Sequence, residues 1–291
     1  MSGEILISNQ ENSTNQDRVI DFEGAKVQYG PFSDRVYIMD TGSAVFPDFL
    51  INIEKFAREE GLGKIFAKAP LSKSRHLRSL GFKTEGLIPG FYSGKEHCVF
   101  MSRFLKPERA LSGELAVINE IVSKAASLKQ GVKKLPEGFS MQECSREDSK
   151  QMAEVYRKVF ETYPFPIHQP DYLLETMQDN VSYYCIRNEK GEIIALSSAE
   201  KDIPAKNAEM TDFAALPESR GMGLAGILLA EMEKCEAKKD IKTAYTIARA
   251  VSHGMNFTFA RAGYKYGGTL INNTNISGRI ESMNLWYKPL S

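Results

Sequence analysis

The sequence predicts an α/β protein built from two units that repeat one plan. Its 291 residues are 42% apolar, which is enough to fill more than one core. Segments with the two-residue period of strands alternate with segments whose apolar residues have helical spacing. Each half runs strand, helix, strand, a helix closed by glycine and an aromatic residue ("RSLGF" and "ARAGY"), and two strands. This agreement, at low identity, indicates a weak internal duplication.

The first unit is expected to cover residues 19–105, after a flexible tail at 1–18 that has no sustained apolar pattern. An amphipathic segment at 46–63 ends at Gly61 and Gly63, which predicts a helix. A second helix is expected at 72–82. Strands are expected at 26–30, 35–40, 64–70, 83–94 and 96–105.

A helix and a linker, residues 106–137, are expected to separate the two units. Leu115, Ile118, Val122 and Ala126 fall at helical spacing, and the following "KQGVKKLPEG" has the glycines and proline of a linker. The second unit covers residues 138–291, with helices expected at 146–160, 171–180, 220–233 and 252–264. Its strands are expected at 139–145, 181–188, 192–200, 207–216, 241–250, 264–271 and 281–288.

Composition argues for a small-molecule partner in the cytoplasm. Lys+Arg and Asp+Glu are equal at 37 each, so no basic field favours nucleic acid or an anionic membrane. No run reaches the roughly 18 apolar residues of a membrane span. The four cysteines are scattered and the four histidines form no local cluster, so we expect neither disulfides nor a metal site.

The segment "RGMGLAGILLAEME", residues 220–233, places glycines directly before an apolar helical run. A helix start exposes unpaired N–H groups at the positive end of the helix dipole, which favours an anion. Gly221 and Gly223 leave the approach open, and Arg220 adds a cationic contact. The segment therefore predicts a phosphate cradle. A tight turn without a ligand is an equal alternative on these residues alone.

Arg220, Gly223 and Ala225, between an apolar strand and an amphipathic helix, resemble the pyrophosphate-binding element of the GCN5-related N-acetyltransferases (GNAT). The order of elements from Met141 to Lys288 also fits that fold. The resemblance implies a mixed, mostly antiparallel twisted sheet flanked by helices, preceded by a degenerate half-copy of the same fold.

The same resemblance implies acetyl-CoA as co-substrate. Main-chain groups near Phe213 and Ala215 would pair with its pantetheine arm. Asn256 corresponds to a polar residue that contacts the pantetheine or thioester, with helix capping as the alternative. The pyrophosphate would be held by Arg220 and by the amides of Gly221, Met222, Gly223, Leu224 and Ala225.

A closer resemblance is to the β-lysine N-acetyltransferases of methanogenic archaea and some bacteria. It rests on "ETYPFPI", "MTDFAALPESRGMGLA", "IKTAYTIARA", "GMNFTFARAGYKYGGTLINNTNISGRIESMNLWYK", "YGPFSDRVYIMD", "KIFAKAP" and "IPGFYSGKE". It implies acetylation of the ε-amine of β-lysine to give Nε-acetyl-β-lysine, a compatible solute, by a possible homodimer. The alternatives are another small amine (lysine, ornithine or a polyamine) and a non-catalytic acetyl-CoA sensor.

A general base is useful because an alkyl amine of pKa near 10.4 costs about 4–5 kcal/mol to deprotonate at pH 7. Glu209 lies where several family members carry a general-base glutamate, so we expect it to be the base. Strand alternation puts it on one face with Thr211 and Phe213, and puts Asp212 on the other. Glu200 ends the preceding strand. Either Glu200 or Asp212 is a candidate to hold the cationic groups of the substrate.

One position departs from the family pattern. Phe259 stands where the family often has a tyrosine that protonates the leaving thiolate. Tyr264, Tyr245 or water would then be the proton donor, or the thiolate leaves without a dedicated acid. Both tyrosines are more readily explained as core aromatics.

The remaining candidates concern the acceptor. Arg249 and Arg279 are candidates for the carboxylate of the substrate, because a guanidinium binds a carboxylate with two hydrogen bonds; an ordinary surface arginine is the favoured alternative for each. Asn273 and Asn275 lie in the polar run "NNTNISGRIES", which is either a substrate loop or a long turn.

"TYPFPIHQP" lies between the first two helices of the second unit, where the superfamily builds its acceptor wall. Tyr163 and Phe165 in this segment are therefore expected to line the acceptor site.

Overall fold

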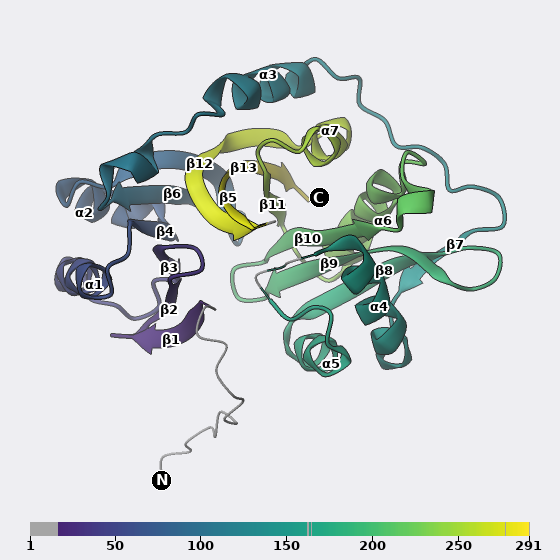
Figure 1. The fold of residues 1–291 in the computed structure, drawn as a ribbon, viewed down its shortest axis with the longest axis horizontal. Helices are drawn as coiled ribbons and strands as arrows, with labels where there is room; N and C mark the ends of the chain where they lie inside the picture. The colour runs from purple at the N-terminus through teal and green to yellow at the C-terminus, as the bar shows by residue number, and fades with distance from the viewer. Residues whose placement is uncertain (1–16, 162, 164, 277, 291) are drawn as a thin grey trace, which may run out of the picture.

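The computed structural model describes residues 17–161, 163, 165–276 and 278–290. Over these residues thirteen strands form one sheet in the order β1-β2-β3-β4-β6-β5-β12-β13-β11-β10-β9-β8-β7 (Figure 1). Most of the predicted tail at 1–18 lies outside the described residues. Its last residue belongs to an unpredicted strand, β1 (Arg18–Phe22), which pairs with the next strand across a two-residue turn at Glu23 and Gly24.

The first half contains the helices and strands expected from its sequence pattern. Helix α1 (Asp48–Glu59) buries Phe49, Leu50, Ile53 and Ala57, which recur at helical spacing. The other elements are β2 (Ala25–Gly30), β3 (Arg35–Asp40), β4 (Lys64–Pro70), α2 (Ser74–Ser79), β5 (Lys83–Tyr92) and β6 (Glu96–Phe104). Helix α3 (Leu115–Ala126) follows, as predicted, and leads through the linker to the second half.

The second half likewise contains the predicted elements. Its helices are α4 (Ser149–Val159), α5 (Pro170–Asp179), α6 (Leu224–Lys238) and α7 (His253–Arg261). Its strands are β7 (Ser140–Glu143), β8 (Val181–Arg187), β9 (Ile193–Asp202), β10 (Asn207–Ala215), β11 (Thr243–Arg249), β12 (Lys265–Ile276) and β13 (Arg279–Pro289).

The two halves of the sheet have the same strand order. In the first half β3 pairs in parallel with β4, and β6 and β5 follow; in the second, β10 pairs in parallel with β11, and β13 and β12 follow. Helix α1 connects β3 to β4 as α6 connects β10 to β11. The predicted mixed, mostly antiparallel sheet flanked by helices is therefore confirmed. That the first half is a degenerate copy, and where the unit boundaries fall, stay predictions.

The halves join where β5 meets β12, through the pair Gly86 and Gly268. A Cβ on Gly268, whose φ is +140°, would lie 2.2 Å from the carbonyl oxygen of Glu85. A Cβ on Gly86 would lie 2.3 Å from Leu285 Cδ1. Because the clash at Gly268 is with the opposite backbone, the join depends on glycine at this position, whereas a side chain at Gly86 requires Leu285 to move.

Three apolar clusters hold the fold together, and one of them spans the join. Phe66, Phe91 and Phe100 from the first half pack with Tyr245 and Leu285 from the second. Because two units that share a buried core do not move apart freely, the halves present a fixed relative geometry to any site between them.

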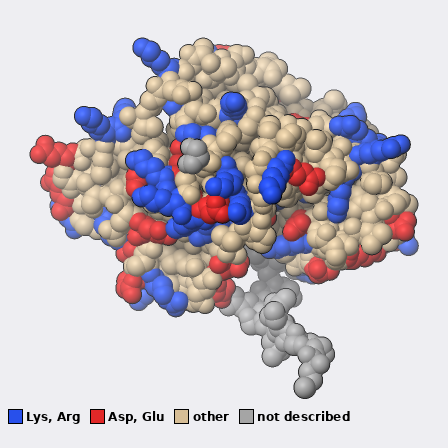
Figure 2. Space-filling model, turned by 180° about the vertical axis from the view of Figure 1, so that it is seen from behind, with Lys and Arg blue, Asp and Glu red and all other residues tan. Residues whose placement is uncertain are grey.

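Acidic and basic side chains lie interspersed on the surface, as the equal numbers of each imply. Figure 2 shows basic side chains near the centre of the rear face with acidic ones among them. Among the described helices, none combines the length and apolarity that crossing a membrane requires.

Candidate active site

Strands β10 and β11 separate part-way along their length. They pair in parallel only from Asn207 to Glu209 of β10 with Thr243 to Tyr245 of β11. Beyond these pairs β10 continues to Ala215 and β11 to Arg249. The diverging ends leave backbone groups of β10 facing the gap, where an extended ligand can pair with them as an added strand. Phe213 and Ala215, the predicted pantetheine contacts, lie in this separated stretch.

A β-bulge in β10 brings Asp212 into the same site as Glu209. Thr211 pairs with Ser198, but Ala214 pairs with Leu196, so β10 contains one residue more than β9 here. Asp212 lies within the bulge, and its φ of +54° accommodates the extra residue. The prediction that Asp212 points away from the face of Glu209 is therefore wrong, because regular alternation is interrupted between them.

A pocket of about 540 Å³ lies at the point where the strands separate, and both halves of the chain line it. The second half contributes the carboxylates of Glu200, Glu209 and Asp212 and the rings of Tyr163, Phe165, Phe213, Tyr245 and Phe259. The first half contributes Lys26, Gln28, Arg35, Tyr37, Met39, Asp40, Phe66 and Lys68. Figure 1 shows the sheet curving so that β3 and β4 lie across from β9 and β10.

Burial and neighbouring carboxylates raise the affinity of Glu200 and Glu209 for protons. Glu200 and Glu209 are directly opposite in the β9–β10 register. Glu200 itself is exposed. Desolvation by the surrounding pocket walls, followed by the charges of Asp212 and Glu209, raises its pKa to about 8. Burial also raises the pKa of Glu209, against the opposing effect of Lys68. The site therefore favours either a retained proton or a bound ammonium group.

Asp212 is oriented by neighbouring hydroxyl groups. Ser198 Oγ donates to Asp212 Oδ2 at 2.6 Å, and the Tyr163 hydroxyl donates to Asp212 Oδ1. Burial raises the pKa of Asp212, and these hydrogen bonds oppose the rise. Tyr163 thus lines the pocket as predicted, and so does Phe165. Two neighbours in their segment, residues 162 and 164, lie outside the described residues.

The glycine segment has the form of an anion cradle. Gly221 and Gly223 have φ of +80° and +84°, and Gly223 is the N-cap residue of α6. Across residues 221–225, none of the five backbone N–H groups donates to an acceptor in the part of the chain that the structure describes. Arg220 beside them is exposed. These groups match the charge and geometry that a diphosphate requires.

The linker contributes a residue to this cradle that the sequence pattern did not reveal. Lys133 Nζ donates to the carbonyl oxygen of Gly221 at 3.1 Å. A Cβ on Gly223 would lie 2.8 Å from Lys133 Cδ. The basic pair in "KQGVKKLPEG" was a visible signal, but nothing local connects it with a loop 88 residues later.

Asn256 has a structural role in place of the contact with acetyl-CoA that the resemblance implied. Its side chain is fully buried, and Nδ2 donates to the carbonyl oxygens of Arg249 at 3.0 Å and Ser252 at 2.7 Å. Its Oδ1 accepts from Asn284 Nδ2 and Trp286 Nε1, each at 2.8 Å. No polar atom remains for a ligand. Asn256 ties the turn before α7 to β13.

We expect Asn256→Ala to lower the free energy of unfolding by about 3 kcal/mol, because it leaves several buried partners without hydrogen bonds. Urea denaturation followed by circular dichroism measures this. Asn52→Ala, which removes one exposed hydrogen bond to Glu23, is the control and should cost less than about 1 kcal/mol. A variant of unchanged stability that binds acetyl-CoA more weakly would restore Asn256 as a donor contact.

Arg249 lines the pocket but is engaged by a carboxylate of the protein. Its Nε and Nη2 donate to the two oxygens of Glu281 at 2.8 and 2.7 Å. Arg279 also donates to Glu281, at 3.0 Å, and is not among the pocket-lining residues. The structure therefore does not support the prediction that these arginines bind the carboxylate of the substrate, because both already bind the carboxylate of Glu281.

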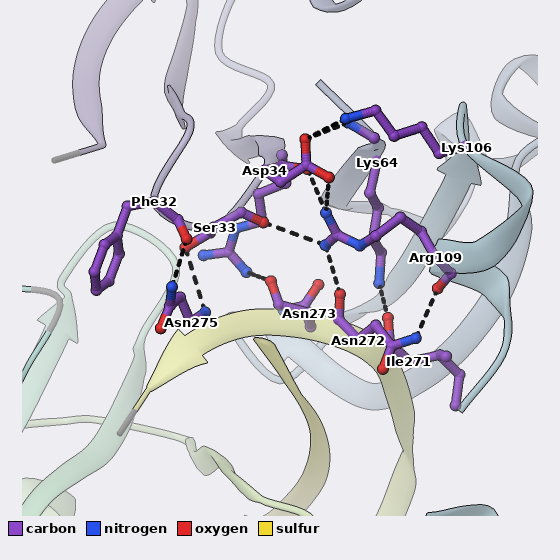
Figure 3. Close-up of polar contacts among 12 residues, drawn as sticks. Phe32, Ser33, Asp34, Lys64, Lys106, Arg109, Ile271, Asn272, Asn273 and Asn275 are labelled. Atoms are coloured by element: carbon purple, nitrogen blue, oxygen red, sulfur yellow. Dashed lines mark hydrogen bonds and ion pairs between the residues drawn. The ribbon is translucent and has the colours of Figure 1, made fainter. Parts of the chain in front are cut away.

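The polar run 272–282 contains the ends of β12 and β13 and forms part of the join between the halves (Figure 3). Its role as a substrate loop stays a prediction. β12 extends to Ile276 and β13 begins at Arg279. Asn275 Nδ2 donates to Phe32 O at 2.7 Å, and Asn273 O accepts from Arg35 Nη1 at 2.5 Å. Asn273 borders the pocket and Asn275 does not.

The candidate proton donors differ in position. Tyr245 lines the pocket opposite Glu209 in the β10–β11 register, and burial raises its pKa well above 10. Tyr264 packs edge-on against Phe259 and is not a lining residue. The geometry therefore favours Tyr245 over Tyr264 for any contact with a reacting group.

Comparison with known proteins agrees with this geometry. Residues 150–264 match the model of the Acetyltransferase (GNAT) family. The chain is 38% identical over 275 residues to a beta-lysine N(6)-acetyltransferase from Methanococcus maripaludis, covering 94% of this chain and 98% of that one. It is 31% identical to one from Methanosarcina mazei, covering 82% and 95%.

Among solved structures, a spermidine N-acetyltransferase from Vibrio cholerae is similar, with 17% identity and a TM-score of 0.47 over 54% of this chain and 96% of that one. The identity and coverage of the archaeal relatives show the family. The chain belongs to the beta-lysine N(6)-acetyltransferases, with its GNAT domain in the second half.

Proposed function

We propose that the protein transfers the acetyl group of acetyl-CoA to the ε-amine of β-lysine. The observation that carries this proposal is the proximity of three carboxylates, Glu200, Glu209 and Asp212, to the point where β10 and β11 separate. An extended donor bound between the strands would end beside groups that attract and deprotonate an ammonium. The names of the archaeal relatives supply the identity of the amine.

The residues that would hold acetyl-CoA fit its chemistry. The five free N–H groups of residues 221–225 and the side chain of Arg220 suit the diphosphate. The backbone of β10 around Phe213 and Ala215 suits the amide groups of the pantetheine arm. When bound, the co-substrate supplies an acetyl thioester.

The protein's own groups would then remove one proton from the substrate ammonium and stabilise the negative charge that develops in the reaction. Glu209 accepts a proton from the substrate ammonium, which leaves a neutral amine that can attack. Glu200 and Asp212 attract the ammonium beforehand, since their raised pKa values fall when a cation binds next to them. Tyr245 is placed to donate a hydrogen bond to groups that gain negative charge.

The test is identification of the product by tandem mass spectrometry. The protein is incubated with acetyl-CoA and, separately, β-lysine, lysine, ornithine or spermidine, while release of free CoA is followed. We expect the fastest turnover with β-lysine, and fragments that place the acetyl group on the ε-nitrogen. Faster turnover of another amine would change the substrate. Binding of acetyl-CoA without CoA release would support the sensor alternative.

Three related expectations stay predictions. The role of the product as a compatible solute is checked by its accumulation at high salt. A homodimer is checked by the molar mass in solution. A cytoplasmic location is checked by fractionation of cells.

A further inference from the structure

The two walls of the pocket carry opposite net charge. The first half lines it with three cations and one carboxylate, Asp40, and the second half with five carboxylates and two cations, Lys201 and Arg249. The second half supplies the carboxylates Glu200, Glu209 and Asp212. The first half supplies the cations of Lys26 on β2, Arg35 on β3 and Lys68 on β4. The site therefore suits a ligand that carries an ammonium at one end and an anion at the other.

Arg35 is already used to hold the join. Its Nη1 donates to Asn273 O and, at 3.0 Å, to Thr274 Oγ1, while Nη2 donates to Gln28 Oε1 at 3.2 Å. Its guanidinium also lies 5.1 Å from the ring centre of Tyr37. These contacts direct Arg35 towards β12 and away from a ligand.

Lys68, unlike Arg35, is not held by contacts at the join. Its ammonium group forms no hydrogen bond or ion pair with any residue that the structure describes, although the side chain lines the pocket. Its Nζ lies 5.8 Å from the ring centre of Phe91 in the shared core. Burial opposes its charge, whereas the carboxylates of Glu209 and Asp202 favour the charge, and the pKa of Lys68 is raised overall. Lys26, in contrast, is exposed at the rim.

β-Lysine has the charge distribution that these walls require. Its ε-ammonium is separated by a short alkyl chain from a carboxylate, whereas a polyamine has ammonium groups only. With the ε-amine at Glu209, the carboxylate needs a cation across the pocket, and an enclosed ion pair is stronger than one in water. Arg249, the cation that the sequence suggested for this task, is engaged by Glu281.

We propose that Lys68, from the first half of the chain, binds the carboxylate of the acceptor and makes the enzyme specific for an amino acid over a polyamine. This inference rests on the proposed function. It also gives the first half a task, because β4 supplies one wall of the acceptor site and the Gly86–Gly268 join sets its distance from the carboxylates.

The test compares β-lysine with 1,4-diaminopentane, which is β-lysine with hydrogen in place of the carboxylate. We expect Lys68→Met to lower kcat/KM for β-lysine by about 100-fold, mainly through KM, because a desolvated charge loses its partner. The kcat/KM for the diamine should fall much less than that for β-lysine, because its only expected loss comes from the higher pKa of Glu209 once Lys68 is gone. Lys68→Arg should restore most of the β-lysine activity. Lys55→Met, an exposed lysine of α1, is the control and should change neither substrate.

The possible outcomes separate the two proposals. If the unmodified enzyme does not acetylate β-lysine, the proposed function fails whatever Lys68 does. If it acetylates β-lysine but uses the diamine equally well, the carboxylate is not bound and the Lys68 proposal is wrong. An equal loss for both amines, with a shifted pH profile of kcat, would assign Lys68 to tuning Glu209 and would also overturn it. Acetyl-CoA binding and the melting temperature of each variant verify that it is folded.

Discussion

Replacing Glu209 by glutamine is expected to lower kcat by about 10²- to 10³-fold while acetyl-CoA still binds. Glutamine keeps the shape of the side chain but cannot accept a proton from an ammonium. The amine must then lose its proton to water at a cost of about 4–5 kcal/mol at pH 7. Steady-state kinetics with β-lysine and a separate binding measurement for acetyl-CoA check both parts. Glu231→Gln, on the exposed face of α6, is the control.

The pH dependence gives a second readout for the same variant. Burial raises the pKa of Glu209, so its basic form is lost, and kcat falls, as the pH drops through that raised value. The Glu209→Gln variant should lack this decrease. Because the charge of Glu209 helps to raise the pKa of Glu200 to about 8, the remaining ionisation should move to lower pH. Unchanged kcat with an unchanged profile would exclude Glu209 as the base.

Gly223→Val is expected to weaken acetyl-CoA binding by about 10- to 100-fold, because a branched residue at a φ of +84° is strained. Its Cβ would also meet Lys133 Cδ at 2.8 Å, so the Lys133 side chain has to leave the carbonyl oxygen of Gly221. Both effects displace the N–H groups that would hold the diphosphate. Isothermal titration calorimetry with acetyl-CoA measures the change.

A matched control separates local strain from loss of the cradle. Gly191 has a φ of +79°, lies in the β8–β9 hairpin turn, and has open space around a built Cβ. Gly191→Val carries a similar backbone cost and should leave acetyl-CoA affinity unchanged. Equal loss of affinity in both variants would mean that destabilisation, and not the cradle, explains the result.

The element order and the donor cradle were predictable because both depend on local chemistry. Helical spacing located α1 and α3, and the two-residue period located β10. Gly221 and Gly223 indicated the left-handed backbone conformation at the start of α6. β1 was missed because its short, partly exposed segment has little periodic signal of its own and is held by its partner strand.

The assignments that failed depended on partners far away in the chain. Asn256 looked like a ligand contact until its hydrogen bonds with Asn284 and Trp286 were visible. Arg249 looked free until Glu281 was placed beside it. Asp212 shares a site with Glu209 through a bulge that only the pairing with β9 reveals. Each of these partners lies in a different turn or strand from the residue that it contacts.

The sequence by itself determined the order of strands and helices, the glycine cradle, and the strand with Glu209 and Asp212 that precedes the cradle. These features depend on periodicity and backbone freedom, which act over a few neighbouring residues. The tertiary structure alone decided that the halves form one sheet, that Lys68 and Glu209 line the same pocket, and that the polar run 272–282 joins the halves. Sheet curvature and the packing of a shared core bring together residues more than a hundred positions apart, and no local pattern encodes which faces will meet.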